Sequence, residues 1–259
     1  MMQRTHGCQS SLFLFVARAP TPGATKTRLG LSIGMDRAAQ LYRAFLVDLA
    51  ARFTPAPGEA RCFDFGWAYT PGDLDFAETL ASIGCAAPTA AMRFVPQEGE
   101  GLGVRLENLF RWASNQGYRR TVIAASDSPQ LPRSVAEHAL AALSDHEVTI
   151  GRTFDGGYYL IGLQGFRDVL SGAPMSTGRE ADALLARAVA LGLRVAELPP
   201  TFDVDEVADL ARLRDALAPD GDVAPATWAA LGALGLRGEG LGGRPGTETA
   251  APPHQLGFG

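Results

Sequence analysis

Cysteine and histidine are scarce in this sequence, and no long apolar run occurs. The three cysteines, Cys8, Cys62 and Cys85, lack the CxxC or histidine-paired spacing of a zinc site, so we expect reduced thiols and no disulfide framework. The four histidines form no pattern that indicates a catalytic histidine. Residues 1–10 have no secretory pattern, and no apolar run reaches the roughly 18 residues of a membrane span. We therefore predict a cytoplasmic protein without a membrane partner.

Basic residues do not outnumber acidic ones. Lysine and arginine total 23 against 28 aspartates and glutamates, which gives a formal net charge of −5 over 259 residues. A general nucleic-acid-binding protein would show a basic face or stripe, so we expect no nucleic-acid partner. Any anionic ligand must be held locally, by a few placed cations, by backbone N–H groups or by a metal.

The segment from Phe15 to Gly30 (FVARAPTPGATKTRLG) lacks the glycine that would make it a P-loop. A P-loop needs glycine before its lysine, because the backbone there wraps around the phosphates, and this chain has Thr25. A P-loop kinase is therefore disfavoured. The segment still combines two prolines, a glycine and the cations Lys26 and Arg28, which is typical of a phosphate-binding loop of another kind. The alternative is that both cations are solvated surface charges.

Hydrophobic periodicity predicts an α/β protein in which strands and helices alternate, with right-handed crossovers and a mainly parallel sheet. Two later strands lie too close in sequence for a helical crossover, so we expect an antiparallel pair. The helix after them opens with Thr177 and Glu180 at capping-box spacing. The predicted strands are 11–17, 62–69, 92–95, 121–125, 147–150, 158–163 and 194–198, and the predicted helices are 36–53, 74–83, a helix ending near 115, 134–143, 176–192, 206–217 and 226–236.

We expect a single domain over residues 11–236, because no internal repeat or linker interrupts this pattern. Residues 1–10 and 237–259 are predicted to be flexible tails. The C-terminal stretch is too poor in apolar residues to pack against a core.

Carboxylates follow two of the predicted strands. Asp127 comes after the 121–125 strand, and Asp203 and Asp205 come after the last strand. Ligands of open α/β sheets bind outside the carboxyl ends of the strands, and two carboxylates from separate loops suit Mg²⁺ or Mn²⁺. The alternatives are an Asx turn at Asp127 and a helix cap at Asp205.

Two glycine-rich segments are also candidates. In FDGGYYLIG, Asp155, Gly156 and Gly157 either form an ordinary hairpin turn or face an acceptor or sugar. In EGLGVR, the glycines form a tight loop, and Arg105 either contacts a ligand or makes a helix-surface salt bridge.

Six ordered segments carry a family resemblance: FVARAPTPGATKTRLG, QEGEGLGVRLENLF, AASDSPQLP, FDGGYYLIGL, STGREADALL and LPPTFDVDEVADL. Together they resemble a bacterial family of glycosyltransferase-like proteins related to the nucleotidyltransferases that make molybdenum and deazaflavin cofactors. Some members are named arsenosugar-biosynthesis glycosyltransferases. The resemblance covers about residues 12–217 and implies the nucleotide-diphospho-sugar transferase (GT-A) fold, a mixed, mainly parallel sheet between helices.

The resemblance also implies roles for residues of this chain. The catalytic residues would be Asp127, Asp205 and Lys26, and the metal ligands would be Asp127 with Asp205 or Asp203. The nucleotide would bind to Ala19, Pro20, Gly23, Lys26, Arg28, Gly101, Gly103 and Arg105. The acceptor would bind to Asp155, Gly156, Gly157, Ser176 and Thr177. The chain departs from its relatives at Arg18, where many have lysine, and in the SDSP segment, where many glycosyltransferases have two aspartates.

Two classes of function fit these residues. The first is a transferase that depends on Mg²⁺ or Mn²⁺ and uses an activated nucleotide. It would transfer sugar from a nucleotide-sugar donor to a small-molecule acceptor or, alternatively, join a nucleoside triphosphate to a phosphorylated small molecule. We favour sugar transfer because relatives are named for it. The second class is a nucleotide-binding protein without turnover.

Overall fold

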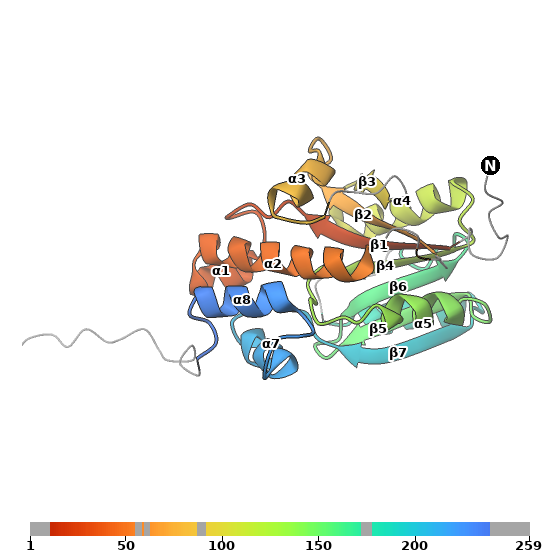
Figure 1. The fold of residues 1–259 in the computed structure, drawn as a ribbon. Helices are drawn as coiled ribbons and strands as arrows, with labels where there is room; N and C mark the ends of the chain where they lie inside the picture. Colours follow the sequence, from red (N-terminus) through yellow and green to blue (C-terminus); the bar gives the residue numbers. More distant parts are fainter. Residues whose placement is uncertain (1–10, 55–58, 60–62, 87–91, 172–177, 239–259) are drawn as a thin grey trace, which may run out of the picture.

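The computed structural model describes residues 11–54, 59, 63–86, 92–171 and 178–238 (Figure 1). Its centre is a seven-stranded sheet in the order β3-β2-β1-β4-β6-β5-β7. β6 runs antiparallel to β4 and β5, and the other neighbouring strands pair in parallel. The predicted mixed, mainly parallel sheet and the antiparallel pair are therefore confirmed. The strands are β1 (Ser11–Arg18), β2 (Asp64–Thr70), β3 (Met92–Pro96), β4 (Arg120–Ala125), β5 (Val148–Thr153), β6 (Tyr158–Gln164) and β7 (Val195–Thr201).

The helices follow the predicted alternation with one addition. A short helix, α1 (Thr27–Ile33), occupies the end of the segment that we expected to be a loop. Its N-cap residue, Lys26, makes no side-chain cap hydrogen bond, and Gly30 lies in its interior. Neither a capping signal nor helix propensity therefore predicts this helix. The other helices are α2 (Met35–Phe53), α3 (Phe76–Ser82), α4 (Gly101–Asn115), α5 (Ser134–Ala142), α6 (Glu180–Ala190), α7 (Asp209–Leu217) and α8 (Pro225–Ala233).

Side chains of β1 alternate between two cores on opposite faces of the sheet. Phe13 and Phe15 pack with residues of α2, α5, α7 and α8, whereas Leu12 and Leu14 pack with residues of α4 and α6. All four are fully buried, as expected for a central parallel strand that is covered on both faces. This two-sided packing fixes the carboxyl end of β1, from which the first loop emerges.

A buried carboxylate joins α2 to α8. Asp48, with 3% of its surface exposed, accepts hydrogen bonds from the backbone N–H groups of Ala226 and Thr227 at 2.9 and 2.7 Å. These donors lie in the first turn of α8, where no intrahelical acceptor exists for them. Asp48 therefore attaches the last described helix to the core.

Replacing Asp48 with alanine should lower the free energy of unfolding by about 2–4 kcal/mol, because two buried N–H groups lose their acceptor. Asp48→Asn keeps one acceptor oxygen and should lose less. Urea denaturation of the two variants measures the difference. Equal stability of the alanine and asparagine variants would show that these hydrogen bonds do not hold α8.

No helix in the described part of the chain is long and apolar enough to cross a membrane. Cys85 is a free thiol, and burial raises its pKa to about 11. Cys8 and Cys62 lie outside the described residues.

Candidate functional site

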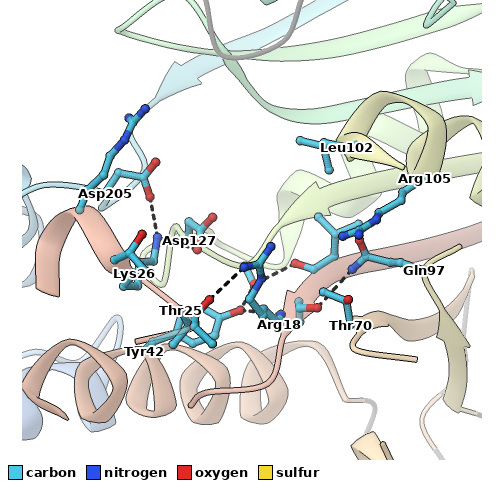
Figure 2. A pocket seen from close by; sticks show the side chains of 17 residues that line it. Arg18, Thr25, Lys26, Tyr42, Thr70, Gln97, Leu102, Arg105, Asp127 and Asp205 are labelled. Atoms are coloured by element: carbon cyan, nitrogen blue, oxygen red, sulfur yellow. Dashed lines mark hydrogen bonds and ion pairs between the residues drawn. The ribbon is translucent and has the colours of Figure 1, made fainter. Parts of the chain in front are cut away.

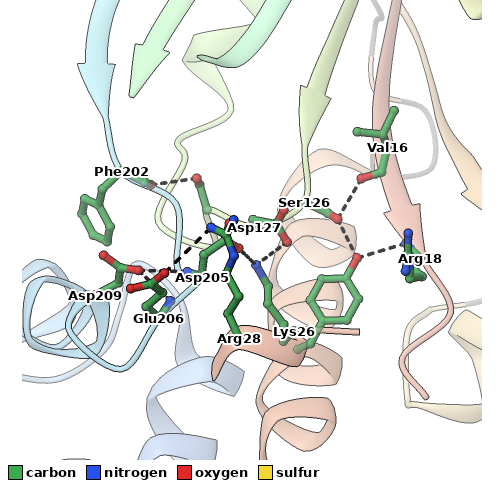
Figure 3. Close-up of polar contacts among 12 residues, drawn as sticks. Val16, Arg18, Lys26, Arg28, Ser126, Asp127, Phe202, Asp205, Glu206 and Asp209 are labelled. Atoms are coloured by element: carbon green, nitrogen blue, oxygen red, sulfur yellow. Dashed lines mark hydrogen bonds and ion pairs between the residues drawn. The ribbon is translucent and has the colours of Figure 1, made fainter. Parts of the chain in front are cut away.

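Lys26 is the centre of the site. Its side chain is only 4% exposed, and its Nζ lies 2.6 Å from Asp127 Oδ1 and 2.8 Å from Asp205 Oδ1 (Figure 3). Burial by itself would lower the pKa of Lys26, but the charges of Asp127 and Asp205 outweigh it and hold the pKa above its usual value. Lys26 also has a φ of 48°, in the left-handed region that non-glycine residues rarely adopt. This backbone conformation turns the ammonium group toward the two carboxylates.

Hydrogen bonds between two loops bring the carboxylates together. Asp127 follows β4 and Asp205 follows β7, and the backbone N–H of Val204 donates to the carbonyl of Asp127 at 3.0 Å. Ser128 Oγ donates to the carbonyl of Phe202 at 2.8 Å. Two hydrogen bonds thus join the two loops. The predicted convergence of Asp127 and Asp205 is present in the structure, with the Lys26 ammonium between them.

The alternative of a helix cap at Asp205 does not hold. In the turn before α7, the carboxylate that accepts from backbone N–H groups is that of Asp209. Its Oδ2 accepts from the N–H groups of Asp205 and Glu206 at 3.0 and 2.8 Å. Lys26 is not a solvated surface charge either. Arg28 resembles a solvated surface charge more closely. Its side chain is 66% exposed, and its Nη1 lies 3.8 Å from Glu206 Oε1.

A chain of hydrogen bonds lies beneath Lys26. The backbone N–H of Arg18 donates to Tyr42 Oη at 3.2 Å, and Tyr42 Oη lies 2.7 Å from Ser126 Oγ. Ser126 gives its proton to the carbonyl of Val16 at 2.8 Å, so Tyr42 must donate to Ser126. Burial, with the charge of Asp127, raises the pKa of Tyr42 to about 12. These hydrogen bonds connect α2 to the ends of β1 and β4. The sequence analysis missed Tyr42 because its position in the helical pattern of α2 indicates only a core residue.

Lys26 and its partners line a cavity of about 540 Å³. Figure 2 shows Lys26, Asp127 and Asp205 at one end, and Thr70, Gln97 and Arg105 at the other. The predicted site residues that line it are Lys26, Arg28, Gly101, Arg105, Asp127 and Asp205. Residues that sequence reasoning did not assign also line it, among them Thr70, Gln97 and Leu102.

The structure does not bring every predicted nucleotide-binding residue to this cavity. Ala19 and Pro20 line a different hollow, shared with Arg43 and Leu74. Gly23 and Gly103 are not among the residues that line the Lys26 cavity. The role of these four residues in nucleotide binding stays a prediction.

A smaller hollow of about 190 Å³ shares Arg28 and Asp205 with the cavity. Phe154 in its wall is 61% exposed, and the guanidinium of Arg212 lies 6.0 Å from the Phe154 ring centroid. Five carboxylates and two guanidinium groups line this hollow, which is therefore net negative: Asp155, Asp203, Asp205, Glu206 and Asp209 face Arg28 and Arg212. We refer to it as the acidic hollow.

The DGG segment borders the acidic hollow through Asp155. Asp155 Oδ1 accepts from the N–H of Gly157 at 3.2 Å and from the hydroxyl of Thr153, as in an Asx turn. Gly156 has a φ of +94°, and a Cβ there would lie 2.1 Å from the carbonyl oxygen of Gly178. Packing of this turn thus already requires glycine at 156. Ser176 and Thr177 lie outside the described residues, and the acceptor roles of the whole set stay predictions.

Asp127 and Asp205 are the carboxylates that fit a divalent metal whose other ligands are water or phosphate oxygens. Within the described ranges, no three His, Cys, Asp or Glu side chains form a group that could hold a metal ion. Asp127 and Asp205, 33% and 43% exposed, each use only Oδ1 on Lys26. Mg²⁺ usually takes one or two carboxylates and completes its shell with water and phosphate oxygens, so this pair fits such an ion. Asp203, the third predicted ligand, lines the acidic hollow instead.

Asp203 should make stability depend on pH. Burial raises its pKa from 3.8 to about 6, with help from the charges of Asp205, Asp155 and Asp127. A carboxyl with a raised pKa in the folded state destabilises the fold once it ionises. In metal-free buffer we therefore expect Asp203→Asn to be more stable than wild type at pH 8, by about 2 kcal/mol. The advantage should fade as the pH falls through 6 toward 4.

Thermal unfolding across this pH range tests the expectation. Asp73→Asn is the control, because Asp73 is exposed and has no hydrogen bond or ion pair within the described residues. A stability gain in Asp203→Asn that is the same at pH 4 and pH 8 would contradict the proposed charge repulsion.

Comparison with known proteins places the chain among nucleotide-handling folds. Residues 59–177 match a family described as "Uncharacterized protein conserved in bacteria (DUF2064)". A crystal structure of a "putative nucleotide-diphospho-sugar transferase" from Desulfovibrio desulfuricans G20 is 32% identical, with a TM-score of 0.76 over 87% of this chain and 96% of that one. No match to a curated protein was found.

Two more distant structures share the fold alone. A cytidylyltransferase from Leptospira borgpetersenii serovar Hardjo-bovis is 14% identical, with a TM-score of 0.53 over 88% of this chain and 94% of that one. A 4-diphosphocytidyl-2C-methyl-D-erythritol synthase from Anaerococcus prevotii is 10% identical, with a TM-score of 0.50 over 80% of this chain and 96% of that one. The 32% identical structure confirms the predicted nucleotide-diphospho-sugar transferase fold.

Proposed function

The chain belongs to the bacterial family DUF2064, and from this premise we propose that it is a transferase that uses an activated nucleotide. We propose further that it moves a glycosyl group from a nucleotide-sugar donor to a hydroxyl group of a small acceptor. The observation that carries this proposal is the Lys26 ammonium, held by Asp127 and Asp205 at one end of a cavity large enough for a nucleotide.

The Lys26 ammonium is positioned to donate a hydrogen bond to a phosphate oxygen. An ammonium group has three N–H donors, and Lys26 uses two of them on Asp127 and Asp205. The third remains for a ligand in the cavity, where Arg18 and Arg28 add positive charge. Because the ammonium is already held in place, it loses little freedom when it binds a diphosphate.

Asp127 and Asp205 are the residues that would hold Mg²⁺ or Mn²⁺. The ion would offset the negative charge of a departing diphosphate. Lys26 keeps the two carboxylates side by side, which counters their mutual repulsion before any ligand arrives.

The acidic hollow supports sugar transfer over nucleotidyl transfer. It adjoins the Lys26 cavity through Arg28 and Asp205, and carboxylates outnumber guanidinium groups in its lining. A phosphorylated acceptor would be repelled there. A hydroxyl-bearing acceptor without negative charge could instead donate hydrogen bonds to the carboxylates and place apolar surface on Phe154.

Product analysis tests the proposal. The protein is incubated with Mn²⁺, a panel of nucleotide sugars and nucleoside triphosphates, and two acceptor pools, one neutral and one phosphorylated. We expect release of nucleoside diphosphate that depends on a neutral acceptor and stops with EDTA. Release of pyrophosphate from a triphosphate with a phosphorylated acceptor would overturn sugar transfer. Nucleotide binding without any product would indicate a non-catalytic nucleotide-binding protein.

A further inference from the structure

A hollow of about 490 Å³ lies between the first loop, α2 and α3 (Figure 1). It shares no lining residue with the Lys26 cavity, and the proposed chemistry does not use it. Sites for small molecules are commonly of this size. Residues 19–21 of the first loop line it together with Arg43 of α2, Thr79 and Ser82 of α3, and the apolar Leu74 and Ile83. We call it the Arg43 hollow.

Arg43 is a half-buried cation without a partner. Within the described residues its guanidinium makes no hydrogen bond or ion pair, whereas every other half-buried arginine there makes at least one. Among the described residues, no aspartate or glutamate lines the hollow. A partly buried charge is costly unless a group of opposite charge or a hydrogen-bond partner meets it. The guanidinium is therefore available to a ligand that enters the hollow.

The hydroxyl groups on the α3 wall can only accept hydrogen bonds from a ligand. Thr79 Oγ1 donates its proton to the carbonyl of Asp75 at 2.9 Å, and Ser82 Oγ donates to the carbonyl of Thr79 at 2.7 Å. Each hydroxyl has a single proton, so only lone pairs remain. These oxygens suit the hydroxyl groups of a ligand and repel an anionic oxygen placed against them. An anionic group must therefore lie toward α2, at Arg43.

Hydrogen bonds hold the walls of the Arg43 hollow in place. In the first loop, the N–H of Ala19 donates to the carbonyl of Thr70 at 2.9 Å, and the N–H of Thr21 donates to the carbonyl of Ala19 at 2.8 Å. At the start of α3, Asp75 Oδ1 accepts from the N–H of Glu78 at 2.9 Å. A ligand thus meets a preformed site, which limits the loss of conformational freedom on binding.

We propose that the Arg43 hollow binds a small hydroxylated oxyanion, such as a sugar phosphate or a sugar acid. The planar guanidinium of Arg43 pairs with two oxygens of the phosphate or carboxylate group. Hydroxyl groups of the same ligand donate to Thr79 and Ser82. A neutral sugar lacks the group that Arg43 holds. The site is separate from the proposed transferase reaction, because none of its residues lines the Lys26 cavity.

Calorimetric titration with glucose 6-phosphate and with gluconate, in buffer that contains EDTA, tests this assignment. At least one of the two should bind wild type, and the comparison tells whether the oxyanion is a phosphate or a carboxylate. Neutral glucose should bind at least about tenfold more weakly than the preferred anion, because it cannot make the charged hydrogen bonds. Arg43→Met keeps the length of the side chain without its charge and should weaken the preferred anion at least about tenfold.

Arg119→Met is the matched control variant, because Arg119 is exposed and its side chain also lacks a partner within the described residues. It should change the affinity less than about twofold, and so should Lys26→Met, which removes the cation of the other cavity. Binding that is lost in Lys26→Met would place the anion in the Lys26 cavity and overturn the inference. Unchanged affinity in Arg43→Met, equal losses in Arg43→Met and Arg119→Met, or binding of neither anion would also overturn it.

Thr79→Val is a second variant that does not depend on the folding of Arg43→Met. It keeps the shape of the side chain and removes the oxygen that accepts from a ligand hydroxyl. We expect the preferred anion to bind at least about threefold more weakly. An affinity equal to that of wild type would contradict the placement of the ligand hydroxyl groups on α3.

Discussion

Lys26→Met is expected to lower kcat/KM for the nucleotide donor by about 10³-fold. The substitution removes the ammonium that lies within 2.8 Å of both Asp127 and Asp205 and leaves two carboxylates facing the diphosphate. The loss of attraction and the added repulsion act in the same direction. Steady-state kinetics with saturating acceptor measures the effect.

Arg28→Met is the matched control for this prediction. It removes a cation two positions away whose side chain is 66% exposed, so water and salt already screen its charge. We expect a loss of about tenfold or less. If the two substitutions reduced kcat/KM equally, the buried position of Lys26 between the carboxylates would have no special role.

Asp127→Asn and Asp205→Asn should each reduce kcat/KM by about 10²-fold or more, because each removes a carboxylate that holds Lys26 and is proposed to hold the metal. The double variant should lose little more than the stronger single variant. The effects of substituting two groups that hold one cation are not additive, because the first substitution already disables the shared cation site.

The kinetics of the three variants, each measured over a range of Mn²⁺ concentrations, check this coupling. The single variants should also need more Mn²⁺ for half-maximal rate. Additive losses, or losses without any change in Mn²⁺ dependence, would contradict a shared cation site formed by Asp127 and Asp205.

Most of the fold could be predicted from the sequence because the strands are continuous apolar runs and the long helices have clear periodicity. The helix α1 and the C-terminal end of β7 could not be predicted. α1 has a glycine in its interior and no capping side chain. β7 continues through Pro199 and Pro200 to Thr201, although prolines usually end a strand. β7 tolerates them because it is an edge strand that pairs only with β5.

The site was predictable only in outline. The meeting of Asp127 with Asp205 follows from their position after β4 and β7, since strand ends converge on one side of an open sheet. The entry of Lys26 between them depends on its left-handed backbone, which no sequence pattern announces. The orientation of Gln97 depends on carbonyls of β1 and β2 that are far away in sequence. Contacts of this kind appear only when the strands are assembled.

A crystal structure with Mn²⁺ and the preferred nucleoside diphosphate tests the central claim most directly. We predict the diphosphate within hydrogen-bond distance of Lys26 Nζ, and Mn²⁺ on Asp127 and Asp205. A nucleotide bound elsewhere on the molecule, with the Lys26 cavity free of phosphate, would contradict the account.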